Sequence, residues 1–359
     1  MNFTPFSIKN DLWGYLCATD KKIVMYGMGN GANKILAVCE KYGIEICDFF
    51  ASDGFVRGHS FHGKRVLSYS EVKEKYGMEN IIVLLSFASS LPDVIANIKR
   101  IGKECELYAP DVPVCGNELF TLEFAKAHSE ELQKVYELLE DELSKRIYTN
   151  VIFYKLTGDI KYLFDAESDK AEVYTSLLNA QSITSYADLG AYNGDTVREL
   201  MQYAKDLSTV SAFEPDRRSF RKLCEWCDTA DIAFKINKVN AAAWSCETTL
   251  TFGDEGNRNS GIFAKGKAVE VAATSLDIYL NGEDVDYIKY DVEGCEKEAI
   301  EGSTRTILSH RPRLLVSAYH RSEDIFALPL QIKALRADYK LYLRRHPYIP
   351  AWDLNLICV

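Results

Sequence analysis

The fold of this chain is decided by the stretch Tyr186-Ala187-Asp188-Leu189-Gly190-Ala191-Tyr192-Asn193-Gly194-Asp195-Thr196. Its apolar start predicts the end of a buried strand. Gly190 and Gly194 then predict a sharp turn that a ligand can approach closely. From Asp195 to about Leu207 the apolar residues fall on one face of a helix. A strand, a glycine turn and a helix in this order predict a unit of an open α/β sheet, with free helical N–H groups facing a bound anion or carboxylate.

A second apolar segment follows at a distance that suits a neighbouring strand. It runs from Val210 to Phe213 and ends in the carboxylate of Glu214. In open α/β sheets the carboxyl ends of the strands form the ligand crevice, and an acidic residue at the end of the second strand accepts hydrogen bonds from a ribose diol. The glycine spacing differs from the dinucleotide pattern Gly-x-Gly-x-x-Gly. An ordinary glycine turn before a helix is the alternative for this motif taken alone.

Length and composition are those of an ordinary globular protein. The chain has 359 residues, more than a single core usually supports, so two domains are expected. Its 47% hydrophobic and 26% charged residues are typical of a soluble protein. The net charge of −10 argues against a nucleic-acid partner or an anionic membrane surface, because either would need a basic face.

Targeting and metal-binding patterns are absent from the sequence. Met1–Asp20 lacks the signature of a signal peptide, and no apolar run approaches the ~20 residues of a membrane helix. The ten cysteines show no disulfide framework, which favours a reducing cytoplasm. Cys224 and Cys227 have no second pair and fit a helix. His59 and His62 flank a glycine-rich turn, which favours a solvated loop over a metal site.

Residues 1–110 predict a small parallel α/β domain. An apolar strand at Lys22–Tyr26 leads into a glycine turn and a helix, and Gly27, Gly29 and Ala32 fit the dinucleotide fingerprint if alanine replaces its third glycine. The domain resembles Rossmann-like modules of nucleotide-sugar proteins. It is therefore a candidate to bind a nucleotide or nucleotide-sugar, or to mediate a homodimer. Residues 111–183 follow with a helical pattern and predict a bridge to the C-terminal domain.

Two later strands in residues 184–359 end in polar side chains. Asp286–Tyr290 predicts a strand that delivers Asp291 and Glu293 to the edge of the sheet. A strand starting at Arg313 ends in Tyr319-His320. Because the carboxyl ends of parallel strands meet at one edge, these residues are expected near the glycine turn and Glu214.

The remaining strands are expected at the sheet edges and at the C-terminus. Asn240 ends an apolar strand, where it would meet the adenine side of a nucleoside. Residues 257–261 lie between two further strands, as a mobile flap or a plain hairpin. The last two strands predict a C-terminal antiparallel hairpin. Arg344, Arg345 and His346 beside it are explained equally well by contacts to a glycan or acidic substrate and by a solvated face.

Together these motifs resemble a known family. Asp-x-Gly-x-x-x-Gly with a strand-terminal Glu resembles class I S-adenosylmethionine-dependent methyltransferases. The later elements, Asn240-Ala241-Ala242, Thr274-Ser275-Leu276-Asp277 and Lys289-Tyr290-Asp291-Val292-Glu293-Gly294, resemble the FkbM family within that class. The resemblance covers nearly half of the chain and implies a Rossmann-like doubly wound sheet over 184–359 that ends in an antiparallel hairpin. It also implies S-adenosyl-L-methionine as cofactor and O-methylation of a hydroxyl of a sugar, glycan or related metabolite.

The resemblance also assigns roles in cofactor binding. The residues assigned to the cofactor are Asp188, Gly190, Asn193, Gly194, Glu214 and Asn240. Asp188 is placed at the methionine end, Glu214 at the ribose, and the glycines where the backbone approaches the ligand.

Asp291 is the first candidate for a general base or acceptor-orienting group, and His320 is the second. A base is expected because a sugar hydroxyl is a poor nucleophile. The alternatives are a carboxylate stabilised by a helix N-terminus for Glu293 and a structural role for His320. Asp291 and Glu293 also suit a divalent cation, but two oxygen ligands are too few, and no metal is assigned.

Two other functions compete with the methyltransferase. One is a non-catalytic nucleotide-sugar-binding or scaffolding module with a degenerate methyltransferase half. The intact glycine turn and both strand-end carboxylates argue against it. The other is an NAD-linked oxidoreductase built on the N-terminal domain, which lacks the Tyr-x-x-x-Lys pair of short-chain dehydrogenases. The sequence does not identify the methyl acceptor, and it predicts no nucleic-acid or membrane partner.

Overall fold

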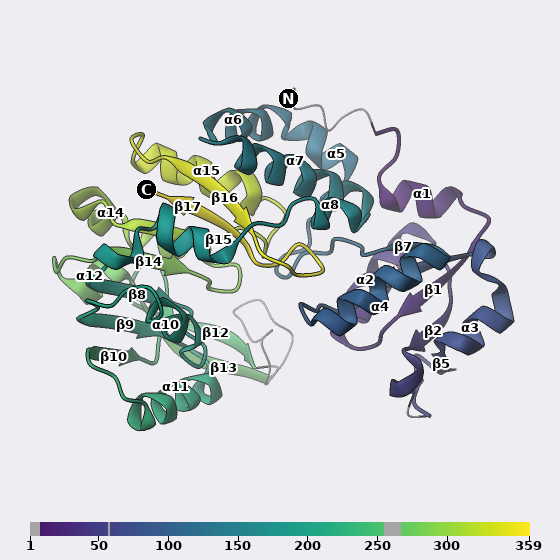
Figure 1. The fold of residues 1–359 in the computed structure, drawn as a ribbon, viewed down its shortest axis with the longest axis horizontal. Coiled ribbons are helices and arrows are strands. Elements are labelled where there is room, and N and C mark those ends of the chain that lie inside the picture. The colour runs from purple at the N-terminus through teal and green to yellow at the C-terminus, as the bar shows by residue number, and fades with distance from the viewer. Residues whose placement is uncertain (1–7, 57, 255–266) are drawn as a thin grey trace.

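The computed structural model describes residues 8–56, 58–254 and 267–359. A parallel sheet and a mostly parallel sheet lie in different parts of the molecule, and a layer of helices lies across the top between them (Figure 1). The flap predicted at residues 257–261 falls outside the described residues. No helix within the described ranges has both the length and the apolar character needed to cross a bilayer.

The N-terminal sheet has the strand order β5-β2-β1-β6-β7, and all its pairs are parallel. Its strands are β1 (Lys22–Tyr26), β2 (Ile46–Ala51), β5 (Leu67–Ser68), β6 (Ile81–Leu85) and β7 (Glu106–Tyr108), and a small hairpin adds β3 (Ser60–Phe61) and β4 (Lys64–Arg65). The helices of this part are α1 (Leu12–Ala18), α2 (Asn30–Tyr42), α3 (Tyr69–Tyr76) and α4 (Pro92–Glu104). The strand β6 is buried along its whole length, as a continuous apolar run in a parallel sheet covered on both faces should be.

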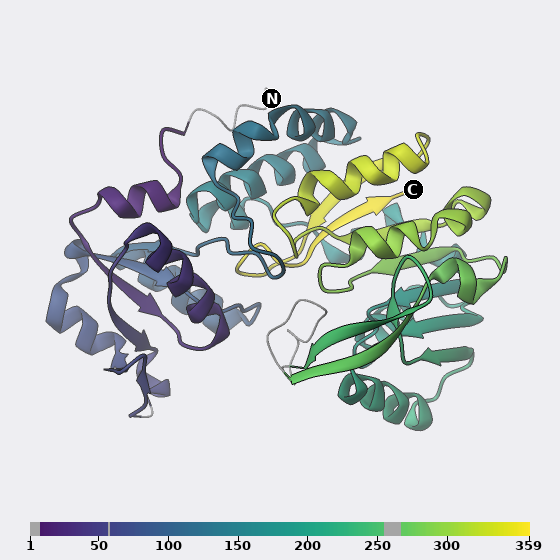
Figure 2. The ribbon, with the colours of Figure 1, turned by 180° about the vertical axis from the view of Figure 1, so that it is seen from behind.

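The helical segment packs onto the C-terminal sheet. It contains α5 (Leu122–Ala127), α6 (Ser129–Leu138), α7 (Glu142–Thr157), α8 (Lys161–Phe164) and α9 (Lys170–Glu172). Figure 2 shows these helices beside the yellow C-terminal segment. The Leu343 backbone N–H donates to Ser144 Oγ of α7 at 2.9 Å. One apolar core runs from Val24 of β1 through Tyr148 of α7 to Leu343, so the three segments predicted from the sequence pack together.

The C-terminal sheet has seven strands in the order β10-β9-β8-β14-β15-β17-β16. These strands are β8 (Ser185–Leu189), β9 (Thr209–Phe213), β10 (Lys235–Val239), β14 (Tyr287–Tyr290), β15 (Arg313–Ser317), β16 (Leu341–Arg345) and β17 (Leu354–Cys358). All neighbours are parallel except β17, which is antiparallel to both β15 and β16. The chain order reverses between β8 and β14. This is the doubly wound sheet with a C-terminal hairpin that the sequence predicts.

Helices and a smaller sheet complete the C-terminal part. The helices are α10 (Asp195–Leu200), α11 (Arg217–Thr229), α12 (Leu276–Leu280), α13 (Glu296–Glu301), α14 (Thr304–His310) and α15 (Asp324–Leu335). The smaller sheet contains β11 (Ala242–Ala243), β12 (Thr248–Asp254) and β13 (Lys267–Thr274), in the order β11-β13-β12. Cys224 and Cys227 lie in α11 and are both free.

The arginines of the last hairpin are structural. Arg344 and Arg345 are fully buried. Both explanations predicted from the sequence, a solvated face and a contact to the substrate, are therefore wrong for these two arginines. Arg344 donates to both oxygens of Glu172 at 2.8 Å and to Asp141 Oδ2 at 2.7 Å. Arg345 donates to the Leu163 carbonyl oxygen at 2.7 Å. The reason is that the helical segment covers β16, a long-range contact that no local pattern near these residues indicates.

Candidate active site

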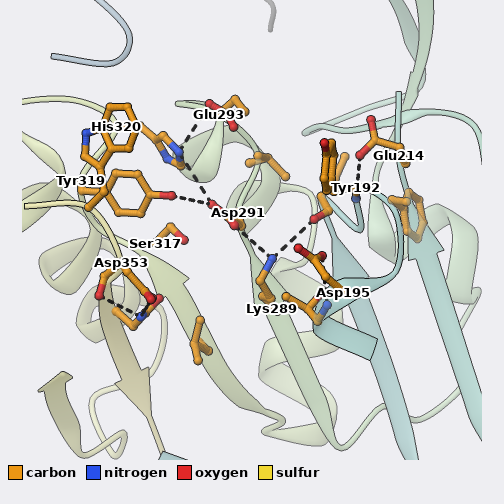
Figure 3. Close-up of a pocket in the computed structure, with 18 of the residues that line it drawn as sticks. Tyr192, Asp195, Glu214, Lys289, Asp291, Glu293, Ser317, Tyr319, His320 and Asp353 are labelled. Carbon is orange, nitrogen blue, oxygen red and sulfur yellow. Dashed lines mark hydrogen bonds and ion pairs between the residues drawn. The ribbon is translucent and has the colours of Figure 1, made fainter. Parts of the chain in front are cut away.

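A cavity of about 380 Å³ lies at the carboxyl ends of β8, β9, β14 and β15. This is the edge of the sheet beside the reversal between β8 and β14, where open α/β sheets bind their ligands. Of the residues predicted from the sequence, the cavity wall contains Gly190, Glu214, Asp291 and His320. Figure 3 shows Glu214 on one side of the site and His320 on the other, with Asp291 between them.

The glycine turn brings the ends of β8 and β14 into contact. Gly190 has φ +93°, and a Cβ atom there would overlap the carbonyl oxygen of Asp291. Gly194 has φ +82°, and a Cβ atom there would overlap the Trp226 ring. The turn therefore needs both glycines because other parts of the protein pack against it. This packing is a reason for the motif that the sequence does not reveal.

Gly190→Ala should lower the free energy of unfolding by about 3 kcal/mol. The left-handed backbone costs a side chain about 1–2 kcal/mol, and overpacking against the Asp291 carbonyl oxygen adds about 1–3 kcal/mol. Gly43→Ala is the matched control, because Gly43 has φ +68° but no atom within 4 Å of the position that a Cβ would take, and it should lose only about 1–2 kcal/mol. Urea unfolding of both variants gives the comparison, and equal losses would contradict the close contact.

Glu214 anchors the turn from the neighbouring strand. It is buried and accepts the backbone N–H of Tyr192 at 2.8 Å and that of Asp216 at 2.7 Å, one on each carboxylate oxygen. Burial raises the pKa of Glu214 to about 8, against the opposing effect of these two backbone donors. Each oxygen keeps a second lone pair, so the carboxylate can accept further hydrogen bonds at the cavity wall.

Four predicted cofactor residues, Asp188, Asn193, Gly194 and Asn240, lie outside the cavity lining. Asp188 is fully buried and accepts from Thr196 Oγ1 at 2.5 Å, and its other oxygen lies 3.6 Å from Lys289 Nζ. Asn193 accepts from Arg198 at 2.9 Å through its side-chain oxygen. Asn240 donates to the Glu214 carbonyl oxygen at 2.8 Å. In this structure these side chains hold the turns that carry the cavity residues, and their direct contacts with the cofactor stay predictions.

Asp291 is held at the cavity wall by partners on β14 and in the segment after β15. Its Oδ2 lies 3.2 Å from Lys289 Nζ, and its Oδ1 accepts from the Tyr319 hydroxyl at 3.3 Å. Burial acts to raise the pKa of Asp291, but Lys289 and His320 outweigh it and hold this pKa below its ordinary value. Its side chain is 31% exposed. Asp291 is therefore an ionised carboxylate accessible from the cavity.

His320 faces three carboxylates. Its Nδ1 lies 2.9 Å from Glu296 Oε1, and its Nε2 lies 3.6 Å from Glu293 Oε2 and 3.7 Å from Asp291 Oδ1. Burial acts to lower the pKa of His320, but the carboxylates, Glu296 first, raise it to about 10. This direction favours the imidazolium form in the ligand-free protein, and an imidazolium is a hydrogen-bond donor. Asp291 as the first candidate base and His320 as the second stay predictions.

Most of the chain that forms this cavity matches a known protein family. Residues 188–348 match the sequence model of the methyltransferase FkbM domain. The chain carries an FkbM methyltransferase domain. The match confirms the methyltransferase prediction, and with it S-adenosyl-L-methionine as the cofactor of the family. No curated relative matches the sequence.

One solved structure shares the fold over nearly the whole chain. The methyltransferase FkbM from Methylobacillus flagellatus KT is similar over 94% of this chain and 90% of its own, with a TM-score of 0.69 at 20% sequence identity. This likeness shows the fold. An rRNA methylase from Streptococcus thermophilus gives a TM-score of 0.35 at 14% identity, over 53% of this chain and 96% of its own. Fibrillarin from Aeropyrum pernix, solved with natively bound S-adenosyl-L-methionine, gives a TM-score of 0.33 at 12% identity. The match covers 50% of this chain and 68% of the fibrillarin chain.

The FkbM site fits the cofactor at the Glu214 side of the cavity. The free lone pairs of Glu214 suit a ribose diol, which donates two hydrogen bonds. The apolar residues beside it suit a purine ring and are Phe213, Pro215, Ala242 and Ala243. The Gly190 turn lies between this wall and Asp291, so a nucleoside bound at Glu214 would place its remaining part toward Asp291.

Sequence reasoning missed several residues of the FkbM site. Lys289 is part of a motif quoted for the family, but only the sheet register shows that it faces both Asp188 and Asp291. Glu296 follows that motif, and nothing in its spacing indicates the contact with His320. Trp352 comes from the loop before β17 and reaches the cavity because β17 inserts between β15 and β16.

Proposed function

We propose that the protein is an S-adenosylmethionine-dependent O-methyltransferase that acts on a hydroxyl of a sugar, glycan or related metabolite. The observation that carries the proposal is the partly exposed carboxylate of Asp291, which contacts Lys289 and Tyr319 and lies in the same cavity as Glu214. When bound, the cofactor supplies an electrophilic methyl group. The protein then has to orient the acceptor hydroxyl and exclude water.

The residues around Asp291 suit this task. Its carboxylate accepts a hydrogen bond from the acceptor hydroxyl and takes its proton as the reaction proceeds. Lys289 and Tyr319 fix the direction of the carboxylate. The imidazolium of His320 offers a donor to a second polar group of the acceptor. A sugar presents several such groups and also an apolar face, and the rings of Tyr348 and Trp352 in the cavity wall suit that face.

The segment after the N-terminal sheet supports a role of that domain at the acceptor side. Val114 lines the cavity, and the Cys115 backbone N–H donates to the His320 carbonyl oxygen at 2.9 Å. Lys34 of α2 donates to the Val114 carbonyl oxygen at 2.7 Å. Two further roles of this domain stay predictions, namely binding of a nucleotide or nucleotide-sugar and assembly as a homodimer.

We also propose that the protein works in a reducing compartment such as the cytoplasm, because all ten cysteines are free.

Calorimetric titration of the purified full chain tests the proposed cofactor. S-adenosylmethionine and S-adenosylhomocysteine should bind with micromolar affinity, and NAD should not bind. Binding of NAD alone would move the function to the N-terminal domain, and binding of none of them would favour the non-catalytic module. Mass spectrometry of sugars and nucleotide-sugars incubated with the protein and S-adenosylmethionine then tests the acceptor, where a gain of one methyl group on oxygen is expected.

A further inference from the structure

Four side chains form a cluster at the acceptor side of the cavity. The carboxylate–histidine cluster consists of Asp291, Glu293, Glu296 and His320. Asp291 and Glu293 come from the turn after β14, Glu296 from the first turn of α13, and His320 from the segment after β15. One ligand atom each of Asp291, Glu296 and His320 can be chosen so that all lie within 4.8 Å of one another.

His320 is oriented but not satisfied within this cluster. The side chain is 1% exposed, and its Nε2 has no hydrogen-bond partner within the described part of the chain. Glu296 Oε1 lies at ion-pair distance, 2.9 Å, from the opposite ring nitrogen, which also has no partner with hydrogen-bond geometry among the described residues, and Glu296 itself accepts the Val292 backbone N–H at 2.9 Å. The Nε2 atom therefore points at Asp291 and Glu293 from a fixed position (Figure 3).

The spacing around Nε2 is close to that of ligands around one ion. Two ligand atoms that each lie about 2.1 Å from one cation at a tetrahedral angle are about 3.4 Å apart. The observed distances from Nε2 are 3.6 Å to Glu293 and 3.7 Å to Asp291. The ligand atoms that lie within 4.8 Å of one another belong to Asp291, Glu296 and His320, so Glu293 has to rotate toward Asp291 to share an ion with it. Its side chain is 36% exposed, which leaves room for that rotation.

We propose that Asp291, Glu293 and His320 bind one divalent cation, and that Glu296 orients the imidazole for it. The cation displaces the proton from His320 Nε2, so it replaces the imidazolium donor of the metal-free protein. A carboxylate on the far nitrogen of a ligating histidine is the usual arrangement around such metals. The mixture of nitrogen and oxygen ligands favours Mn²⁺ or Zn²⁺ over Mg²⁺ or Ca²⁺. The remaining coordination positions face the cavity, where they suit an acceptor hydroxyl. That last role rests on the proposed function, whereas the binding of the cation does not.

Titration of the chelator-treated full chain with Mn²⁺ tests the site. Mn²⁺ is the first probe because thiols compete for Zn²⁺ and the chain has ten free cysteines. Calorimetry and electron paramagnetic resonance should find one Mn²⁺ bound per chain. Glu293→Gln, a change at a partly exposed residue that keeps the fold, should weaken binding at least about tenfold, and Glu296→Gln should weaken it about 10- to 100-fold.

The matched control is His310→Ala, which removes a histidine paired with exposed Asp284 on the surface. It should leave Mn²⁺ binding unchanged. No Mn²⁺ binding by the wild-type chain, or equal binding by Glu293→Gln and wild type, would overturn the site. Because no cofactor or acceptor is present in this experiment, its failure is distinct from a failure of S-adenosylmethionine to bind.

Discussion

Asp291→Asn should reduce turnover by about 10²- to 10⁴-fold, the usual contribution of a positioned general base, while the affinity for S-adenosylmethionine stays the same. The amide keeps the shape of the side chain but has no negative charge for Lys289 and no basic oxygen for the acceptor proton. Single-turnover kinetics measures the methyl transfer, and calorimetry measures cofactor binding. Unchanged turnover would end the role of Asp291 as base or orienting group.

Asp353→Asn is the control for this experiment. Asp353 also lines the cavity, so its replacement removes the same charge from the same space. Its Oδ1 accepts from the Asn355 side chain at 2.8 Å, and it acts on Tyr319 only through its charge. Turnover within about tenfold of wild type is expected. Equal losses in both variants would show that the charge of the cavity matters, and not the position of the Asp291 carboxylate.

Glu214→Ala should weaken S-adenosylmethionine binding by about 100-fold or more. Each hydrogen bond to a charged group contributes about 1.5–3 kcal/mol, and a ribose diol offers two of them to this carboxylate. Calorimetric titration measures the loss. Because Glu214 also accepts the backbone N–H groups of Tyr192 and Asp216, the folded state of the variant has to be checked by circular dichroism. A folded variant with wild-type affinity would reject the ribose role.

The pH dependence of binding provides a second test of Glu214. The ribose hydroxyls donate to the carboxylate, so cofactor binding favours its ionised form. With a pKa of about 8 in the free protein, the affinity should rise as the pH increases toward 8 and become constant above it. Glu214→Gln should lack this dependence.

The stability of the cofactor-free protein should change in the opposite direction. The folded state holds the proton of Glu214 more tightly than the unfolded chain does. Protonation of Glu214 therefore adds to the free energy of unfolding at pH values below its ordinary pKa. This stabilisation is lost as the pH rises from about 4.5 to about 8. Urea unfolding across this pH range measures the loss, and Glu214→Gln again provides the control.

Much of the fold follows from local patterns. The apolar strands, the glycine turn and the strand-end carboxylates Glu214 and Asp291 predict a doubly wound sheet and the edge at which its cavity opens. These predictions succeed because a parallel strand is buried on both faces and because its carboxyl end meets those of its neighbours. The predicted C-terminal hairpin is also present, with β17 between β15 and β16.

The side-chain partners within the site do not follow from local patterns. Asn240 ends its strand as predicted, yet its side chain bonds to the backbone after β9. Asp188 is in the predicted motif but lies beneath the cavity. In both cases the direction of the side chain depends on what the next element places against it. The assignments of these residues to the cofactor stay predictions.

The sequence by itself determined the class of fold, the family of the C-terminal domain and the edge of the sheet where its chemistry takes place. Only the tertiary structure decided that Gly190 is required by the carbonyl of Asp291, that Arg344 is buried, and that Glu296 orients His320. The physical reason is the sequence separation of the residues that make these contacts. Periodicity and turn residues report on neighbours along the chain, whereas these contacts join residues from different strands and helices that meet only when the sheet is assembled.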